Sequence, residues 1–183
     1  MHLVFIILFS SIAYLLGSFP TSVWFGKYYF KIDLRKHGSG NPGATNTFRV
    51  LGRRAGTIVL LGDILKGAIA TTLAVVLLKL DFIYPDELVR FRLLFGVFAV
   101  IGHVFPVFLN FKGGKEGATL SGVTLAIAPE GAAISIAVFM TVLIIYGFLL
   151  TVVIVWTHRK NIRHLIKGEE NQIYLIPRGN KGA

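Results

Sequence analysis

Residues 132–156 read "AAISIAVFMTVLIIYGFLLTVVIVW", a run of 25 residues without one charged side chain. A helix needs about 20 predominantly apolar residues to cross the hydrocarbon core of a bilayer. This run is long enough, and polar groups other than Ser, Thr and Tyr hydroxyls are nearly absent from it. It predicts a transmembrane helix, so the rest of the chain is interpreted as a membrane protein.

Apolar runs of similar length occur elsewhere in the chain, each with a few polar residues inside it. The tract 118–156 is too long for one crossing, so we divide it at "PEG", 129–131. The predicted spans are 3–25, 57–80, 93–111, a short, tilted or partly re-entrant segment from 118 to 129, and 132–156. The sequence predicts an all-α, polytopic membrane bundle of about five transmembrane helices. Residues 1–170 are expected to form one membrane-embedded domain, and 171–183 a disordered cytoplasmic tail.

The basic residues are distributed unevenly between the two sides of this bundle. Thirteen of the 19 Lys and Arg residues lie in three segments, which follow the first, third and fifth spans. With five spans these segments share one side, and the positive-inside rule makes that side cytoplasmic. The N-terminus is therefore expected outside and the C-terminus inside. The net charge of +10 would suggest nucleic acid in a soluble protein, but here topology accounts for it and we expect no nucleic-acid partner.

Cysteine and histidine usage limits the chemistry. The chain has no cysteine, which excludes disulfides and cysteine-based metal sites. Its five histidines are scattered, without metal-binding spacing such as H-E-x-x-H. We expect neither a metal nor another cofactor.

The first polar segment is "GSGNPGATNTFRVLGR", 38–53. Ser39 or Asn41 is a good helix N-cap, and Pro42 suits the first helical position. The helix is expected to end near Leu51, with Gly52 terminating it.

Polar side chains recur along this predicted helix at spacings of three and four. Thr45, Asn46, Arg49 and Arg53 are expected to share one face. Small polar residues at a helix N-terminus, followed by arginine, are typical of a phosphate site. The alternative is a capped interfacial helix with snorkelling arginines.

The second polar segment is "FKGGKEGATLSG", 111–122, placed between two apolar runs. The backbone N–H groups of Gly113 and Gly114 could converge on an anion and form a nest. Lys112 and Lys115 supply charge and Thr119 a hydroxyl, and the next helix, starting near 118, adds its dipole. The spacing does not match a Walker A loop. The alternative is a flexible cytoplasmic turn.

The third polar segment is "HRKNIRHLIKG", 158–168, which predicts an amphipathic interfacial helix. His158 and Asn161 are three apart and could face one pocket, although an ordinary juxtamembrane helix explains the segment as well.

Ionisable residues also occur inside the predicted spans. Asp63 and Lys66 lie on one face of the second span, where charged groups are costly and usually paired; we expect a pair that supports a site. His103 is expected to be a structural histidine.

The stretches "GSGNPGATN", "DILKG", "GHVFPVFLNFKGGK" and "HRKNI" together resemble the bacterial acyl-phosphate:glycerol-3-phosphate acyltransferases. The resemblance covers roughly 10–129 and 156–170, in the family's order. It implies a multi-pass enzyme of the cytoplasmic membrane that transfers a fatty acyl group from acyl phosphate to the 1-hydroxyl of sn-glycerol 3-phosphate. The products are lysophosphatidic acid and phosphate, the first step of phospholipid synthesis. Acyl phosphate, glycerol 3-phosphate and membrane lipid are the implied partners.

The resemblance also implies roles for individual residues. Lys115, Ser39 and His158 are the implied catalytic residues, with Lys115 stabilising the departing phosphate and polarising the acyl carbonyl. The attacking hydroxyl would lose its proton to the substrate's own phosphate or to His158. Asp63, Lys66 and His103 would support the site. The implied substrate-binding residues are Ser39, Asn41, Thr45, Asn46, Arg49, Lys112, Gly113, Gly114, Lys115, Thr119 and Asn161.

Two features depart from the family pattern. The family usually reads "GGKGVAT", whereas this chain reads "GGKEGAT", so Glu116 places a carboxylate beside the implied phosphate site. A unit charge at about 5 Å, with an effective dielectric constant near 20, costs roughly 3 kcal/mol, or about a hundredfold in binding. The family is also expected to have seven spans, whereas five are predicted here. The loss of one helical hairpin removes two spans, so all three motifs stay on the same side of the membrane.

These departures leave a second interpretation open. The chain would then be a non-catalytic membrane protein on the same scaffold that binds anionic lipid or phosphate. An anion transporter is a weaker third interpretation, because the charges gather at one face and no inverted repeat is visible.

Overall fold

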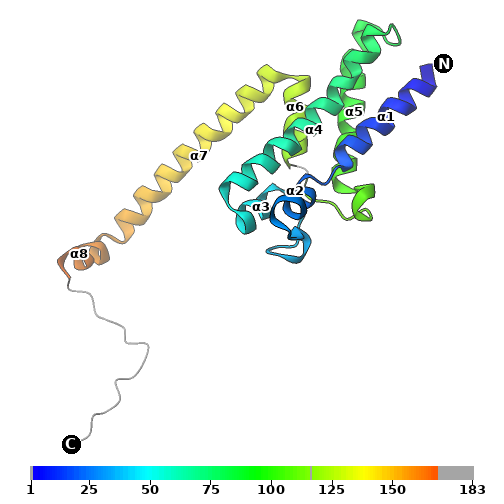
Figure 1. Cartoon of the computed structure of the whole chain (residues 1–183). Coiled ribbons are helices and arrows are strands. Elements are labelled where there is room, and N and C mark those ends of the chain that lie inside the picture. The colour runs from blue at the N-terminus through cyan, green and yellow to red at the C-terminus, as the bar shows by residue number, and fades with distance from the viewer. Residues whose placement is uncertain (1, 116, 169–183) are drawn as a thin grey trace, which may run out of the picture. The chain divides into compact units, whose positions relative to one another are not determined.

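The structure of the protein, a computed structural model, describes residues 2–115 and 117–168. All the regular elements in these ranges are helical, which confirms the all-α prediction (Figure 1). The α-helices are α1 (His2–Ser18), α2 (Thr21–Phe30), α3 (Ala44–Leu51), α4 (Arg53–Lys79), α5 (Leu88–Val104), α6 (Gly117–Ile127), α7 (Pro129–Thr157) and α8 (Arg159–Lys167). Three short 3-10 turns join them: η1 (Leu34–Lys36), η2 (Pro85–Glu87) and η3 (Val107–Leu109).

Residues 1, 116 and 169–183 lie outside the described residues. The predicted tail, 171–183, and Glu116 both belong to them. The chain divides into two compact units between Ile134 and Ser135.

Long apolar helices confirm that this is a membrane protein. Arg53–Lys79, Pro85–Leu109 and Pro129–Thr157 are long and apolar enough to cross a bilayer, and α1 with α2 makes a fourth if the bent pair counts as one span. The short segment predicted after residue 118 is α6, whose 11 residues rise only about 16 Å at 1.5 Å per residue. Its predicted shortness is therefore confirmed.

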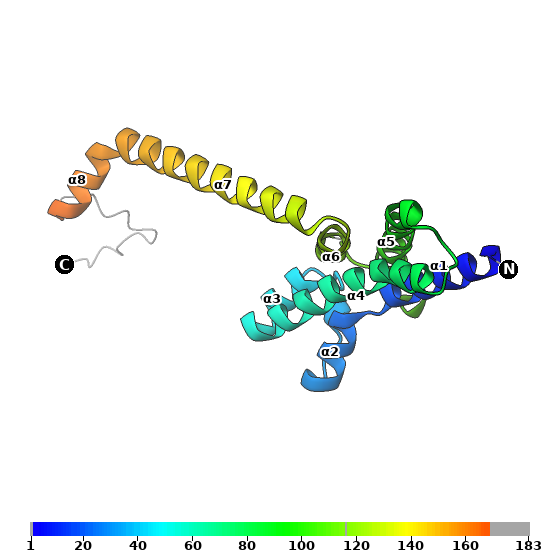
Figure 2. The same ribbon diagram turned by 90° about the horizontal axis from the view of Figure 1, so that it is seen from above.

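The first predicted span, 3–25, is not one straight helix. α1 ends at Ser18 and α2 begins at Thr21, and the two meet at an angle of 46°. Figure 2 shows α2 turning away from the line of α1. Pro20 explains the break, because its ring has no N–H to donate and disfavours a continuous helix.

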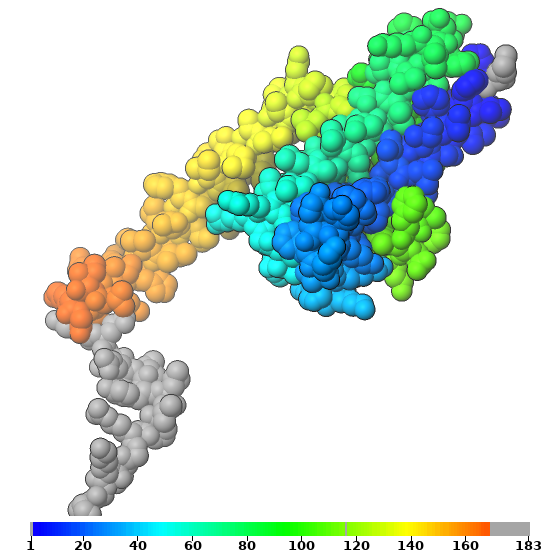
Figure 3. Space-filling view, in the orientation of Figure 1, coloured from blue at the N-terminus to red at the C-terminus, as the bar shows by residue number. Residues whose placement is uncertain are grey.

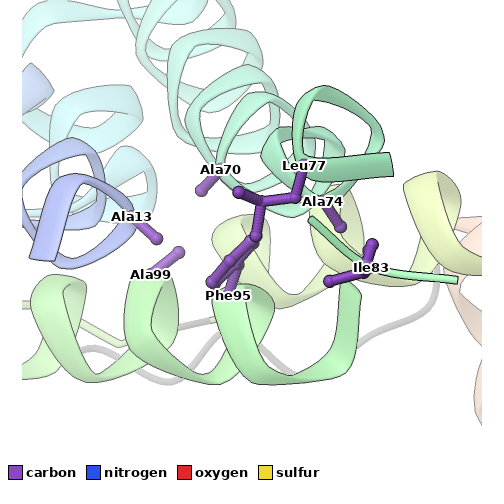
Figure 4. Packing of buried hydrophobic residues seen from close by; sticks show 7 residues of the cluster. All are labelled: Ala13, Ala70, Ala74, Leu77, Ile83, Phe95 and Ala99. Atoms are coloured by element: carbon purple, nitrogen blue, oxygen red, sulfur yellow. The ribbon is translucent and has the colours of Figure 1, made fainter. Parts of the chain in front are cut away.

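Small residues let the helices of the first unit approach closely. A Cβ added to Gly17 of α1 would meet the Ala99 carbonyl of α5, and one added to Gly122 of α6 would meet the Ile64 carbonyl of α4. Close backbone approach through small residues is characteristic of helix packing in membranes. Figure 4 shows the resulting core, in which alanines surround a few larger side chains. Its members are Ala13, Ala70, Ala74, Leu77, Ile83, Phe95 and Ala99.

The division of the last apolar tract at Pro129 is confirmed. α6 ends at Ile127, and α7 begins with Pro129 at its first position, where the missing N–H costs nothing. α7 then runs without a break to Thr157, with apolar side chains on all sides, as in a membrane span. α8 follows at once and ends at Gly168, which has φ 68°.

Candidate functional site

The loop before α3 is held in shape by one asparagine. Asn46 is 1% exposed, and its side-chain Oδ1 accepts a hydrogen bond from the Ser39 N–H at 2.9 Å. Its Nδ2 donates to the carbonyls of Leu34 and His37, both at 3.0 Å. Gly38, with φ 61°, lies directly against this amide. Asn46 therefore uses its hydrogen-bonding groups to fold the loop.

The predicted start of α3 is wrong, although its predicted end is right. The N-cap is Gly43, whereas Ser39 and Asn41 lie in the loop before it. The chain stays extended through Gly43 (φ −158°, ψ 171°), and Gly40, with φ 71°, turns it before Pro42. The helix therefore begins only at Ala44.

The predicted polar face of α3 is also divided. Thr45 and Arg49 are exposed, as expected, but Asn46 is buried against the preceding loop. Gly52, with φ 85°, separates α3 from α4, so Arg53 belongs to the next helix and does not extend the face.

The glycine loop after α5 does not form the predicted anion nest. The N–H of Gly113 donates to the Val104 carbonyl at 3.1 Å, and the N–H of Gly114 donates to the His103 carbonyl at 3.3 Å. Carbonyls in the last turn of a helix have no intrahelical partner. The two N–H groups therefore cap α5, and in this arrangement they point away from an external anion.

Close packing explains why these two residues are glycines. A Cβ on Gly114 would lie 2.5 Å from the Pro42 carbonyl oxygen and 2.9 Å from His103 Nε2. A Cβ on Gly113 would strike the His103 carbonyl. The glycines thus shape the loop, as expected, and they let it approach the loop before α3. Figure 3 shows the segment after α5 (bright green) beside the segment between α2 and α3 (blue).

Asp63 and Lys66 form the predicted buried pair. Lys66 Nζ lies 2.9 Å from Asp63 Oδ1, and the two side chains are 9% and 4% exposed. Thr21 Oγ1 donates to the same Asp63 oxygen at 2.9 Å, and Lys66 Nζ also donates to the Phe19 carbonyl at 3.0 Å.

His103 and Thr119 meet inside the bundle. His103 Nδ1 lies 3.0 Å from Thr119 Oγ1, and the two residues are 5% and 0% exposed. A structural histidine was expected here. The hydroxyl of Thr119 was expected to face the glycine loop, but it is fully buried against the imidazole.

These segments line two adjoining pockets. The inner cleft is lined by the α1–α2 bend, the Asp63–Lys66 pair, His103 and the glycine loop, and it has room for about one water, roughly 10 Å³. The outer pocket has about 350 Å³ and is lined by Arg35, Ser39, Gly40, Asn41, Pro42, Lys112 and Gly113. Pro42 and Gly113 line both pockets. Lys115 is exposed.

A carboxylate neutralises part of the charge at the rim of the outer pocket. Asp33 Oδ2 lies 2.6 Å from Arg35 Nη2 and 3.4 Å from Lys27 Nζ. The hydrogen bonds from Arg35 hold the pKa of Asp33 well below its usual range, and the same contact raises the pKa of Arg35. Arg35 was not predicted as a pocket residue, because it lies in a basic run that membrane topology could also explain.

The third motif lies in the second unit. His158 immediately precedes α8, and its Nδ1 is 3.1 Å from the Ile154 carbonyl of the same helical segment. Asn161 lies in the first turn of α8, and both side chains are exposed. The predicted interfacial helix is confirmed as a helix. Across 2–115 and 117–168, no group of three or more His, Asp or Glu side chains is placed to hold a metal ion.

The fold and the pockets define a helical integral membrane protein with a polar cleft built from two loops that are distant in the sequence. A sequence model of the glycerol-3-phosphate acyltransferase family matches residues 7–149. The glycerol-3-phosphate acyltransferase of Listeria welshimeri is 43% identical over 198 residues, with 92% of this chain and 96% of the relative covered. That of Bacillus subtilis is 42% identical, with 88% and 94% covered. The chain belongs to the glycerol-3-phosphate acyltransferase family.

Solved structures agree with this assignment. The crystal structure of PlsY, an integral membrane glycerol 3-phosphate acyltransferase, in its glycerol 3-phosphate form matches with a TM-score of 0.59 and 32% identity, covering 92% of this chain and 96% of that chain. The lysophosphatidic acid form of PlsY matches with a TM-score of 0.60 and 31% identity.

Proposed function

We propose that this protein transfers a fatty acyl group from acyl phosphate to the 1-hydroxyl of sn-glycerol 3-phosphate at the cytoplasmic membrane. One observation carries the proposal: the loop before α3 and the glycine loop after α5 line one polar pocket. Family membership supplies the reaction, because relatives bear the name of this activity and PlsY was solved in forms with its substrate and lysophosphatidic acid. These names do not favour the non-catalytic alternative.

The charge of the site suits two phosphate substrates. Arg35 and Lys112 line the outer pocket, and Arg49 and Lys115 are exposed on the neighbouring α3 and on the glycine loop. Guanidinium and ammonium groups form strong, charge-assisted hydrogen bonds with phosphate oxygens. Ser39 and Asn41 add polar side chains to the same pocket.

The reaction is one displacement at the acyl carbonyl. The 1-hydroxyl oxygen of glycerol 3-phosphate bonds to the carbonyl carbon, the carbon–oxygen bond to phosphate breaks, and inorganic phosphate leaves with the electron pair. Lys115 and Arg49 stabilise the negative charge on the departing phosphate and on the carbonyl oxygen. The hydroxyl proton passes to a phosphate oxygen or to His158. His158 and Asn161 are assigned to the substrates by their motif alone.

Some residues assigned to the substrates act more indirectly in this proposal. Asn46 folds the loop that carries Ser39 and Asn41. Thr119 holds the His103 ring, and Gly113 and Gly114 bring the two loops together. These four residues position the pocket, whereas exposed polar side chains contact substrate.

We place the N-terminus outside and the C-terminus inside, with α6 and α7 counted as two passages. The alignment with the Listeria relative runs over 198 residues, whereas 92% of this 183-residue chain is about 168. About 30 aligned positions therefore have no residue in this chain, which supports a bundle shorter by one hairpin. Because the chain has no cysteine, single cysteines at Lys36, Asp86 and Lys167 test the topology. An impermeant thiol reagent should reach Asp86→Cys from outside, and Lys36→Cys and Lys167→Cys only after permeabilisation.

The reaction itself is tested with the purified chain in lipid vesicles. Acyl phosphate is supplied with and without glycerol 3-phosphate, and both released phosphate and lysophosphatidic acid are measured. Release that depends on glycerol 3-phosphate, with lysophosphatidic acid formed in equal amount, is the expected result. Folded protein that releases no phosphate would contradict the proposal.

A further inference from the structure

The segment 62–67 of α4, "GDILKG", forms hydrogen bonds to the bend between α1 and α2 on both sides of Pro20. Asp63 Oδ1 accepts the hydroxyl of Thr21 at 2.9 Å, and Lys66 Nζ donates to the carbonyl of Phe19 at 3.0 Å. The same two side chains form an ion pair at 2.9 Å. Both charged groups therefore have partners within the protein, and both bond to the same three-residue stretch, Phe19–Thr21.

The bend has a physical need for such partners. Pro20 interrupts the helix, so the carbonyls at the end of α1 lose their intrahelical donors. Inside a membrane no bulk water replaces these donors, and an unsatisfied carbonyl is costly. The Phe19 carbonyl accepts the N–H of Thr21 at 3.0 Å as well as the Lys66 ammonium. A charged donor makes the stronger kind of hydrogen bond.

The start of α2 also packs directly on α4. A Cβ added to Gly62 would lie 2.8 Å from Thr21 Cγ2. Gly62 therefore leaves the space that lets the Thr21 hydroxyl reach Asp63. We name Gly62, Asp63 and Lys66 together the α4 latch.

The bend held by the latch is one wall of the inner cleft. Five consecutive residues of the bend, Gly17 to Thr21, line that cleft. Pro42 and Gly114, from the two loops of the proposed site, line the same cleft. A change in the bend would therefore displace a wall that adjoins the substrate pocket.

We propose that Asp63 and Lys66 are positioning residues, which hold the α1–α2 bend and thereby the shape of the inner cleft that adjoins the substrate pocket. They act through Thr21 and the Phe19 carbonyl and do not contact substrate. The kinetic consequence rests on the proposed function, whereas the effect on the bend does not.

Suitable variants distinguish the effect of the latch on the bend from a general loss of protein stability. Thr21→Val removes the hydroxyl donor but leaves the ion pair intact, and Thr21→Ser keeps the donor. Lys66→Met alone would leave a buried carboxylate without its cation, which is strongly destabilising. Combining Lys66→Met with Asp63→Asn avoids the unpaired charge and preserves an acceptor for Thr21. It removes the donor to Phe19 together with the ion pair.

The geometry of the bend is measured directly by spin labels. Cysteines replacing the exposed Tyr28 on α2 and Arg54 on α4 give one labelled pair in a chain that otherwise has no cysteine. Thr21→Val and the double variant should broaden or shift the distance distribution between the labels, and Thr21→Ser should leave it as in the parent. An unchanged distribution in both disrupting variants, with folded protein, would overturn the proposal.

A kinetic rescue connects the latch to the cleft. Gly62→Ala should press on Thr21 Cγ2, raising KM for glycerol 3-phosphate about threefold to tenfold, the scale of one or two lost hydrogen bonds, with a smaller change in kcat. Thr21→Ser removes that methyl group and should restore KM in the Gly62→Ala background. Gly147→Ala, whose added Cβ meets nothing within 4 Å, is the matched control. Failure of the rescue would contradict the role of the latch.

The two proposals fail in different ways. If the parent protein transfers no acyl group but the label distances respond to the latch variants, the latch stands and the proposed function is wrong. If transfer occurs but the label distances and KM stay unchanged in every latch variant, the function stands and the latch is wrong.

Discussion

The two units of this chain use their residues in opposite ways. In the first unit, polar side chains such as Asn46, Asp63, Lys66 and Thr119 are buried and bonded to partners from other elements. In the second, none of the described residues from Ser135 onward is buried. Its long helix, α7, is apolar on all sides. The fold of the first unit thus depends on contacts between its helices and loops. The helix of the second unit depends on its apolar composition, which suits a lipid environment.

This difference shows where substitutions should matter. A helix with exposed apolar sides tolerates changes that keep it apolar, because lipid adapts to the altered surface. In the first unit, a single methyl group at Gly67 would meet the Thr119 carbonyl, and that residue holds His103. Changes there should propagate to the cleft.

The largest effect is expected at Lys115. Lys115→Ala removes the ammonium that stabilises the departing phosphate, so kcat/KM for acyl transfer should fall about 10²- to 10³-fold. Lys36→Ala, which removes an exposed lysine from η1, is the control and should change the rate little. The assay is phosphate release dependent on glycerol 3-phosphate. Equal losses in the two variants would show that general positive charge matters, and not the glycine loop.

Glu116, next to Lys115 in sequence, tests the role of charge at the glycine loop by the removal of a negative group. Glu116→Gly removes a negative charge and should lower KM for glycerol 3-phosphate by up to about a hundredfold, the cost of one unit charge at about 5 Å. Glu116→Gln is the matched variant, because it keeps the size of the side chain without the charge. Unchanged KM in both variants would refute electrostatic repulsion at this position.

Glycine-to-alanine substitutions compare the two units most directly. Gly122→Ala should cost about 1–3 kcal/mol of stability, because its Cβ would strike the Ile64 carbonyl. Gly147→Ala meets nothing within 4 Å, and alanine should stabilise that helix by up to about 1 kcal/mol. Thermal unfolding in detergent should therefore give shifts of opposite sign. Two shifts of the same sign would remove the distinction between a packed unit and a lipid-exposed helix.

Composition and periodicity were sufficient for the parts of the fold that depend on local properties. The uninterrupted run 132–156 predicted α7, and Gly52 predicted the end of α3. Pro129 predicted the break before α7, although the helix begins at Pro129 itself and not at 132. The Asp63–Lys66 pair was also predictable, because charges three apart on an apolar helix have few other ways to be satisfied.

Contacts between distant segments could not be predicted in the same way. The glycine pair suggested an anion nest, but its N–H groups are taken by the last carbonyls of α5, which only the path of the chain reveals. Asn46 was expected on the phosphate-binding face of α3, yet its amide bridges Leu34, His37 and Ser39. In both cases the residue type signalled a polar role, while the partner depended on the tertiary fold.

The smallest expected effect concerns pH and the charged rim. The folded state holds the pKa of Asp33 below its ordinary value of 3.8, chiefly through Arg35. The contact therefore stabilises the fold fully above that value, and the stabilisation is lost as pH falls below it. Asp33→Asn should lower stability at neutral pH by at most about 1 kcal/mol, since such pairs are partly exposed.

Unfolding of the parent and Asp33→Asn proteins, followed between pH 7 and about pH 3, tests this expectation. The difference in stability should shrink as the pH approaches and passes 3.8, because the Asp33 carboxylate of the unfolded parent takes up a proton while the folded state still holds it ionised. Asp86→Asn, at an exposed position in η2, serves as the control. A difference that is constant across this range would mean that Asp33 stabilises the rim through packing or neutral hydrogen bonds. The stability of the pocket rim would then depend on the shape and packing of its side chains, and substitutions that change only charge would have little effect there.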